Sequence, residues 1–185
     1  MTNLLKIIEV RIKKWYYKHI WSKKKSKGRG GNMKGYINPA LLIANSILDD
    51  AFEYDYSISP MKLQKLIYFV YKKYLQDNRR PLFNEYFEVW QHGPVLPSVY
   101  REFKRYSGNT ISSYAYFGDR TVRLVSKSHP EIHLALEYVL SRYRRYGAVE
   151  LSQITHQEGT AWSKALSRNE LYLDDDEIGA EPWIK

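Results

Sequence analysis

The sequence predicts a predominantly α-helical α+β fold, a single domain of about five or six helices with a short antiparallel β-hairpin or small sheet. Three observations lead to this class. Asn38, Ser59 and His129 each stand before a proline and a run of apolar residues at helical spacing, which is typical of a helix start. The segments "TISSYAYF" and "TVRLV" flank a short "GDR" loop, which favours a hairpin. With 185 residues and 44% hydrophobic content, the chain is long enough to bury one core.

Positive charge is concentrated in residues 1–34. Of the 29 Lys and Arg residues, 11 lie in this segment, which leaves 18 for the rest of the chain; of the 20 Asp and Glu residues, one lies there, which leaves 19. Residues 1–34 therefore read as a basic amphipathic helix followed by a flexible linker, while residues 35–185 are almost neutral. An alternative is that translation naturally starts at Met33 and that the preceding residues are translated leader.

Two helices are expected in residues 38–80. Asn38 caps the first and Ser59 caps the second, and a proline follows each cap. The second helix carries an apolar stripe made of Leu63, Leu66, Ile67, Val70, Tyr71 and Tyr74. The lysines opposite this stripe are predicted to lie on the surface, namely Lys62, Lys65, Lys72 and Lys73.

A stiff corner is expected between a strand and a helix at residues 85–106. Pro81 breaks the preceding helix, and "EYFEVW" alternates as a short strand does. Gly93 and Pro94 then form a sharp turn, and Pro97 begins a helix. The inner face of this helix is predicted to be Val99, Tyr100, Phe103 and Tyr106. The corner should leave Trp90, His92, Val95 and Leu96 near the surface, where aromatic and aliphatic anchors favour a protein partner.

The remaining chain predicts more helices and an acidic end. Pro130 opens a helix with a buried face through Tyr143, a shorter helix follows, and Thr160 caps a last one. Residues 170–185 form an acidic tail with a proline, which is expected to fray.

No residue pattern predicts catalysis, a metal site or a cofactor. The chain has no cysteine, no phosphate-binding glycine loop and no known nucleophile motif. His129 and His133 are four residues apart, a spacing that can place two metal ligands on the same face of a helix. No carboxylate completes a metal site, so a capping or surface role is favoured. His156 and Glu158 are a minimal proton-transfer pair without a nucleophile. We therefore expect that the protein is not an enzyme.

Three ordered motifs resemble a known family. They are "SPMKLQKL" at 59–66, "GPV-x-P-x-VY" at 93–100 and "TH-x-E-x-x-x-W" at 155–162. The first two lie within the longer stretches "ISPMKLQKLIYFVYKKYL" at 58–75 and "FEVWQHGPVLPSVYREFKRY" at 87–106. Together with "IANSIL", these stretches and the last motif resemble the Panacea antitoxin domain, which is SocA-like and phage-associated, from about residue 43 to 162. The resemblance implies a mostly helical domain at 35–169 that neutralises a toxin by direct contact and has no enzymatic activity.

The motif positions supply the toxin-binding candidates. With His92 added from the corner, they are Lys62, Gln64, Lys65, Tyr68, Trp90, His92, Gly93, Pro94, Val95, Tyr100, His156, Glu158 and Trp162. The resemblance does not say which of them touch a toxin and which hold the fold.

The expected partner is a cognate toxin encoded by a neighbouring gene, and a homo-oligomer is a further possibility. A reducing cytoplasm fits the absence of cysteine. Two alternatives stay open for the function: a nucleic-acid-binding regulator that uses the basic arm, and an adaptor that delivers the toxin to a protease. The nearly zero net charge of residues 35–185 disfavours binding to nucleic acid. Contact of residues 1–21 with a membrane is a further alternative that we do not favour.

Overall fold

Most helices begin where the local signals predict, whereas the last one, α8 (Asp175–Ala180), was not expected. In the computed structural model, which describes residues 38–117, 120–121 and 129–183, the side chain of Asn38 accepts a hydrogen bond from the amide of Ala40. Ser59 accepts one from Lys62, and Thr160 accepts one from Ser163. The helices are α2 (Pro39–Glu53), α3 (Pro60–Asn78), α4 (Pro97–Phe103), α5 (Pro130–Tyr143), α6 (Ala148–Thr155), α7 (Ala161–Ser167) and α8 (Asp175–Ala180), with a 3-10 turn at Lys104–Tyr106. The predominantly helical α+β class is confirmed.

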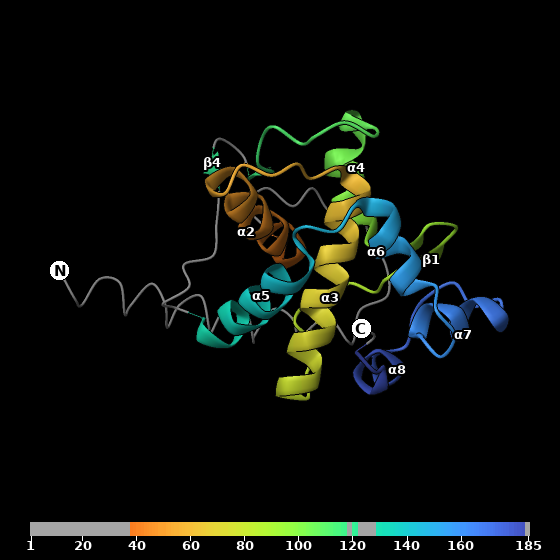
Figure 1. Ribbon diagram of the computed structural model, residues 1–185. Helices are drawn as coiled ribbons and strands as arrows, with labels where there is room; N and C mark the ends of the chain where they lie inside the picture. The colour runs from red at the N-terminus through yellow and green to blue at the C-terminus, as the bar shows by residue number, and fades with distance from the viewer. Residues whose placement is uncertain (1–37, 118–119, 122–128, 184–185) are drawn as a thin grey trace, which may run out of the picture. The chain divides into compact units, whose positions relative to one another are not determined.

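Helix α3 forms the centre of the fold. It packs against α2, α5, α6 and α8 and against strand β2, and Figure 1 shows it as the yellow helix between them. The predicted stripe is buried, and Phe69 stacks on Tyr143 of α5 with ring centroids 4.8 Å apart. The described residues belong to one unit that spans residues 35–185.

The prediction that the α3 lysines lie on the surface is wrong for three of the four. Lys62, Lys65 and Lys72 are 7%, 1% and 2% exposed, whereas Lys73 is partly exposed. The reason is that α3 is covered on nearly all sides, so its polar side is buried as well. Each buried ammonium donates to an acceptor far along the chain.

Two short hairpins supply the β structure of the part of the chain that the structure describes. Strands β1 (Glu88–Trp90) and β2 (Gly93–Val95) are antiparallel, with Trp90 opposite Gly93. Residues 171–173 extend this sheet on the other side of β1, because the amide of Val89 donates to the carbonyl of Leu171. Strands β3 (Tyr116–Phe117) and β4 (Arg120–Thr121) confirm the second predicted hairpin, although Arg120 is in the strand and not in the loop.

The corner is more buried than predicted. Val95 and Leu96 are 7% and 0% exposed, so they belong to the core and not to the surface. In the next helix, Val99 and Phe103 face inward as predicted, but Tyr100 is 40% exposed. Tyr100 and Arg101 are both exposed while Val99 and Phe103 are buried, so one side of α4 is covered and the other faces solvent.

The expectation that residues 170–185 fray is wrong for those that the structure describes. Leu173 and Ile178 are 2% and 1% exposed, and α8 packs on α3. Composition misled here because apolar residues between the charged ones reach the core, and one of the charged residues, Glu181, is itself buried. The basic segment 1–34, with the membrane and start-site interpretations, lies outside the described residues.

Candidate protein-binding site

Two polar side chains of α3 hold the backbone of the Gly-Pro corner. The Gln64 amide donates from Nε2 to the carbonyl of Leu96 at 3.2 Å and accepts from the Leu96 amide at 2.9 Å. Lys65 Nζ donates to the carbonyl of Pro94 at 2.9 Å. Both side chains are buried, so these bonds satisfy backbone groups that water does not reach. The motif residues Gln64, Lys65 and Pro94 therefore hold the fold.

Gly93 is required by close packing as well as by its backbone angle. Its φ is +98°, a conformation that residues with a side chain rarely adopt. A Cβ added here would lie 2.5 Å from Thr155 Oγ1 and 2.9 Å from Lys65 Nζ. The corner can thus approach α3 and α6 only because residue 93 has no side chain.

The last motif binds the turn of the first hairpin. The indole Nε1 of Trp162 donates to the carbonyl of Trp90 at 3.0 Å, and Ser152 Oγ donates to the carbonyl of His92 at 2.9 Å. The ring of His156 lies on Trp162, with centroids 3.9 Å apart. Helices α6 and α7 therefore fix the turn between β1 and β2, and these elements lie together in Figure 1.

Two ionisable groups have lowered pKa values at the junction, the region where α3, α6 and α7 meet the first hairpin and the Gly-Pro corner. Burial lowers the pKa of Lys65 to about 7. The pKa of His156 is also lowered, first by burial and then by the positive charges of Lys65 and His92. His156 Nε2 is buried without a hydrogen-bond partner among the described residues, and its ring is covered by Trp162. Glu158 is exposed, whereas this nitrogen of His156 is buried.

Tyr68 belongs to a second buried cluster, around Glu181. The carboxylate of Glu181 accepts hydrogen bonds from Tyr68 Oη at 2.6 Å, from Lys72 Nζ at 2.7 Å and from the amide of Ala161 at 2.9 Å. Burial, together with the charge and hydrogen bond of Glu181, raises the pKa of Tyr68. This cluster ties the C-terminal segment to α3 and to the start of α7.

Two aromatic candidates form an exposed surface on this rigid support, and a third exposed candidate lies at the adjoining hairpin turn. Trp90 and Tyr100 are 36% and 40% exposed, and their rings meet edge to face with centroids 4.8 Å apart. His92 is exposed at the turn of the hairpin, two residues after Trp90. We name Trp90, His92 and Tyr100 the hairpin patch. The remaining candidates other than Glu158 are buried: Lys62, Gln64, Lys65, Tyr68, Gly93, Pro94, Val95 and Trp162, with His156 partly so.

Comparison with known proteins identifies the family. The family model described as "Antitoxin SocA-like, Panacea domain" matches residues 63–163, more than half of the chain. The chain belongs to the SocA-like Panacea domain family. It is 39% identical to Antitoxin SocA of Caulobacter vibrioides (strain NA1000 / CB15N) over 127 residues, which cover 66% of this chain and 68% of that relative. No solved structure matches.

The Panacea match contains both the junction and the hairpin patch. It begins in α3 and ends in α7, so it includes β1, β2, α4 and α6. Glu181, which holds the buried ends of Tyr68 and Lys72, lies beyond the matched residues.

Sequence reasoning missed Ser152 and Glu181, which are hydrogen-bonded to candidate residues, and it gave Thr155 no role although this residue begins the last motif. Ser152 lies one helical turn before Thr155 on α6, and no sequence pattern distinguishes it from surface residues. Glu181 is a single carboxylate in an acidic segment, and the sequence holds no signal that it is the buried one.

The described residues contain no group of three or more metal-ligating side chains. His129 is the N-cap of α5, and His133 is exposed. Within the same residues, no helix is long and apolar enough to cross a membrane.

Proposed function

We propose that this protein is the antitoxin of a toxin-antitoxin pair and that it neutralises a toxin protein, encoded by a neighbouring gene, by binding it directly at the hairpin patch. The similarity to Antitoxin SocA supports the antitoxin role. The proposal assigns no catalytic step and no cofactor to the chain. The absence of cysteine fits an action in a reducing cytoplasm.

The observation that carries the proposed surface is the exposure of two aromatic motif residues on a fixed backbone. Trp and Tyr are the residues that most often dominate binding energy at protein interfaces. Trp90 and Tyr100 are exposed, although the backbone of Trp90 is bonded to buried Trp162. A rigid surface loses little conformational entropy on binding, so more of its contact energy appears as affinity.

Co-expression tests the proposal. Cells that express the neighbouring toxin gene should grow when wild-type protein is co-expressed and should stop growing with the double variant Trp90→Ala, Tyr100→Ala. The matched control is Tyr116→Ala, because Tyr116 is an exposed tyrosine on β3, outside the patch. Growth rescue by the double variant at wild-type expression levels would exclude the patch as the neutralising surface.

The same cells distinguish neutralisation by contact from delivery to a protease. If contact is sufficient, the amount of tagged toxin stays constant while growth is rescued, and toxin and antitoxin purify together. Loss of the toxin over time would favour an adaptor, and rescue without association would exclude the contact mechanism.

A further inference from the structure

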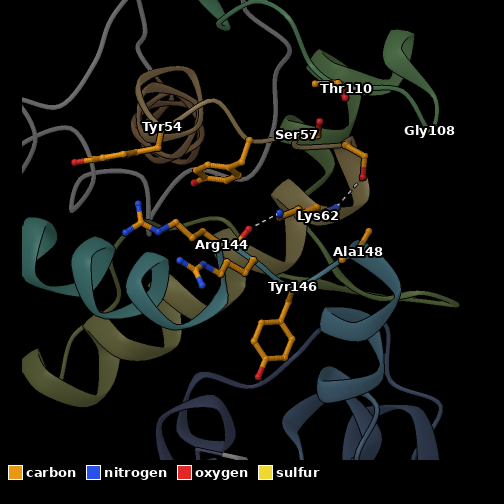
Figure 2. A pocket seen from close by; sticks show the side chains of 12 residues that line it. Tyr54, Ser57, Lys62, Gly108, Thr110, Arg144, Tyr146 and Ala148 are labelled. Carbon is orange, nitrogen blue, oxygen red and sulfur yellow. Dashed lines mark hydrogen bonds between the residues drawn. The ribbon is translucent and has the colours of Figure 1, made fainter.

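A broad pocket of about 730 Å³ lies beside the start of α3, on a part of the molecule that the hairpin patch does not use. Figure 2 shows its walls, which come from the loop after α2, from α3, from the loop before β3 and from the connection between α5 and α6. Its volume is in the range of pockets that hold small molecules. The residues that matter for the argument are Tyr54, Ser57, Lys62, Thr110, Arg144 and Arg145.

The lining is positively charged. Lys62, Arg144 and Arg145 contribute three cations, and no aspartate or glutamate is among the described residues that line the pocket. The Lys62 side chain is buried, and its Nζ is held by a 2.6 Å hydrogen bond to the carbonyl of Arg144. An ammonium has three N–H donors, so Lys62 can bind an anion without giving up this contact.

The two arginines are placed differently. The Arg144 guanidinium lies over the ring of Tyr54, 4.8 Å from its centroid, and 3.7 Å from Asp50 Oδ2. Arg145 is exposed and has no ion pair with any described residue. Arg144 is therefore held in position by its neighbours, whereas Arg145 is available to a ligand.

We propose that this pocket binds a phosphate-bearing small molecule, with its phosphate oxygens bound by Lys62, Arg144 and Arg145. A phosphate monoester carries nearly two negative charges and three acceptor oxygens, so it matches several cations at once. Ser57 and Thr110 add hydroxyl groups to the lining, and Tyr54 offers an aromatic face for the rest of the molecule.

The proposal does not depend on the antitoxin role, since no residue of the hairpin patch lines the pocket. Isothermal titration of the full chain with inorganic pyrophosphate tests it, at about 0.15 M NaCl to screen loosely held counterions. Arg145→Ala should weaken binding about tenfold or more, because a charge-assisted contact is lost. Arg101→Ala is the matched control, since Arg101 is an exposed arginine on α4 outside the pocket.

The outcomes separate the alternatives. Loss of affinity in Arg145→Ala with an unchanged melting temperature, and wild-type affinity in Arg101→Ala, would support the site. Thr110→Val, which removes a hydroxyl without changing charge, should also weaken binding. Undetectable pyrophosphate binding, or equal losses in both arginine variants, would overturn the proposal. Binding of citrate or of an oligo-aspartate peptide as tight as that of pyrophosphate would overturn the assignment to phosphate.

Discussion

The carbonyl oxygen of Trp90 accepts a hydrogen bond from the indole Nε1 of Trp162 at 3.0 Å, although the two residues are 72 positions apart. The Trp90 side chain meanwhile points outward, where its own Nε1 donates to Glu88 Oε2 at 2.7 Å. One motif tryptophan thus fixes the backbone of the other. The Panacea motifs combine residues that build a junction with residues that this junction presents to solvent.

Gly93→Ala should destabilise the fold strongly. The new methyl group would meet Thr155 Oγ1 at 2.5 Å, and the residue would be held at φ +98°. Strain of this kind costs about 1–3 kcal/mol, and the steric overlap adds to it. Urea unfolding measures the loss. Gly108→Ala is the control, because a Cβ there meets nothing within 4 Å. Equal stability of the two variants would contradict the close approach at residue 93.

Glu181→Gln should also be costly, although residue 181 lies in a segment whose composition predicts fraying. The change leaves the Lys72 ammonium buried without its counterion, which typically costs about 3–5 kcal/mol. Glu177→Gln is the control from the same segment, because its partner Arg168 is exposed and keeps Glu170. Thermal unfolding should show a large fall in melting temperature only for Glu181→Gln. A small and equal effect of both changes would contradict the view that Glu181 is needed to compensate the buried Lys72 ammonium.

Lys65 should make stability depend on pH above neutrality. Burial lowers its pKa from 10.5 to about 7, so between these values the unfolded chain keeps a proton that the folded chain releases. The unfolded state then binds more protons, and stability rises as the pH is raised.

A comparison of wild type with Lys65→Met isolates this effect, because other titrating groups are present in both proteins. Between about pH 7.5 and 9.5, the wild type should gain up to about 1.4 kcal/mol per pH unit relative to the variant in urea unfolding. A difference that does not change with pH would mean that Lys65 is charged in the folded state throughout this range.

The local signals at helix starts were sufficient to predict most of the framework. Asn38, Ser59 and Thr160 accept the hydrogen bonds expected of N-caps, because capping involves only residues two or three positions apart. The three motifs also lie in the segments of the chain that form the junction.

What could not be predicted depends on contacts between distant residues. The pattern of α3 suggested one buried face, but Lys65 and Lys72 find acceptors 29 and 109 positions away. No periodicity in a single helix shows that its polar side will also be covered. The opposite error was made for Tyr100, which was expected in the core. The spacing of apolar residues in α4 does not reveal that this helix lies at the edge of the fold, with one side exposed to solvent.

The dissociation constant of the purified complex with the neighbouring-gene toxin tests the central claim most directly. Trp90→Ala and Tyr100→Ala should each weaken binding about 30-fold or more, as truncation of an interface hot spot does. Tyr116→Ala should stay within about threefold of wild type, as expected of residues outside a hot spot. Wild-type affinity in both patch variants, with the fold intact, would show that the toxin is bound elsewhere.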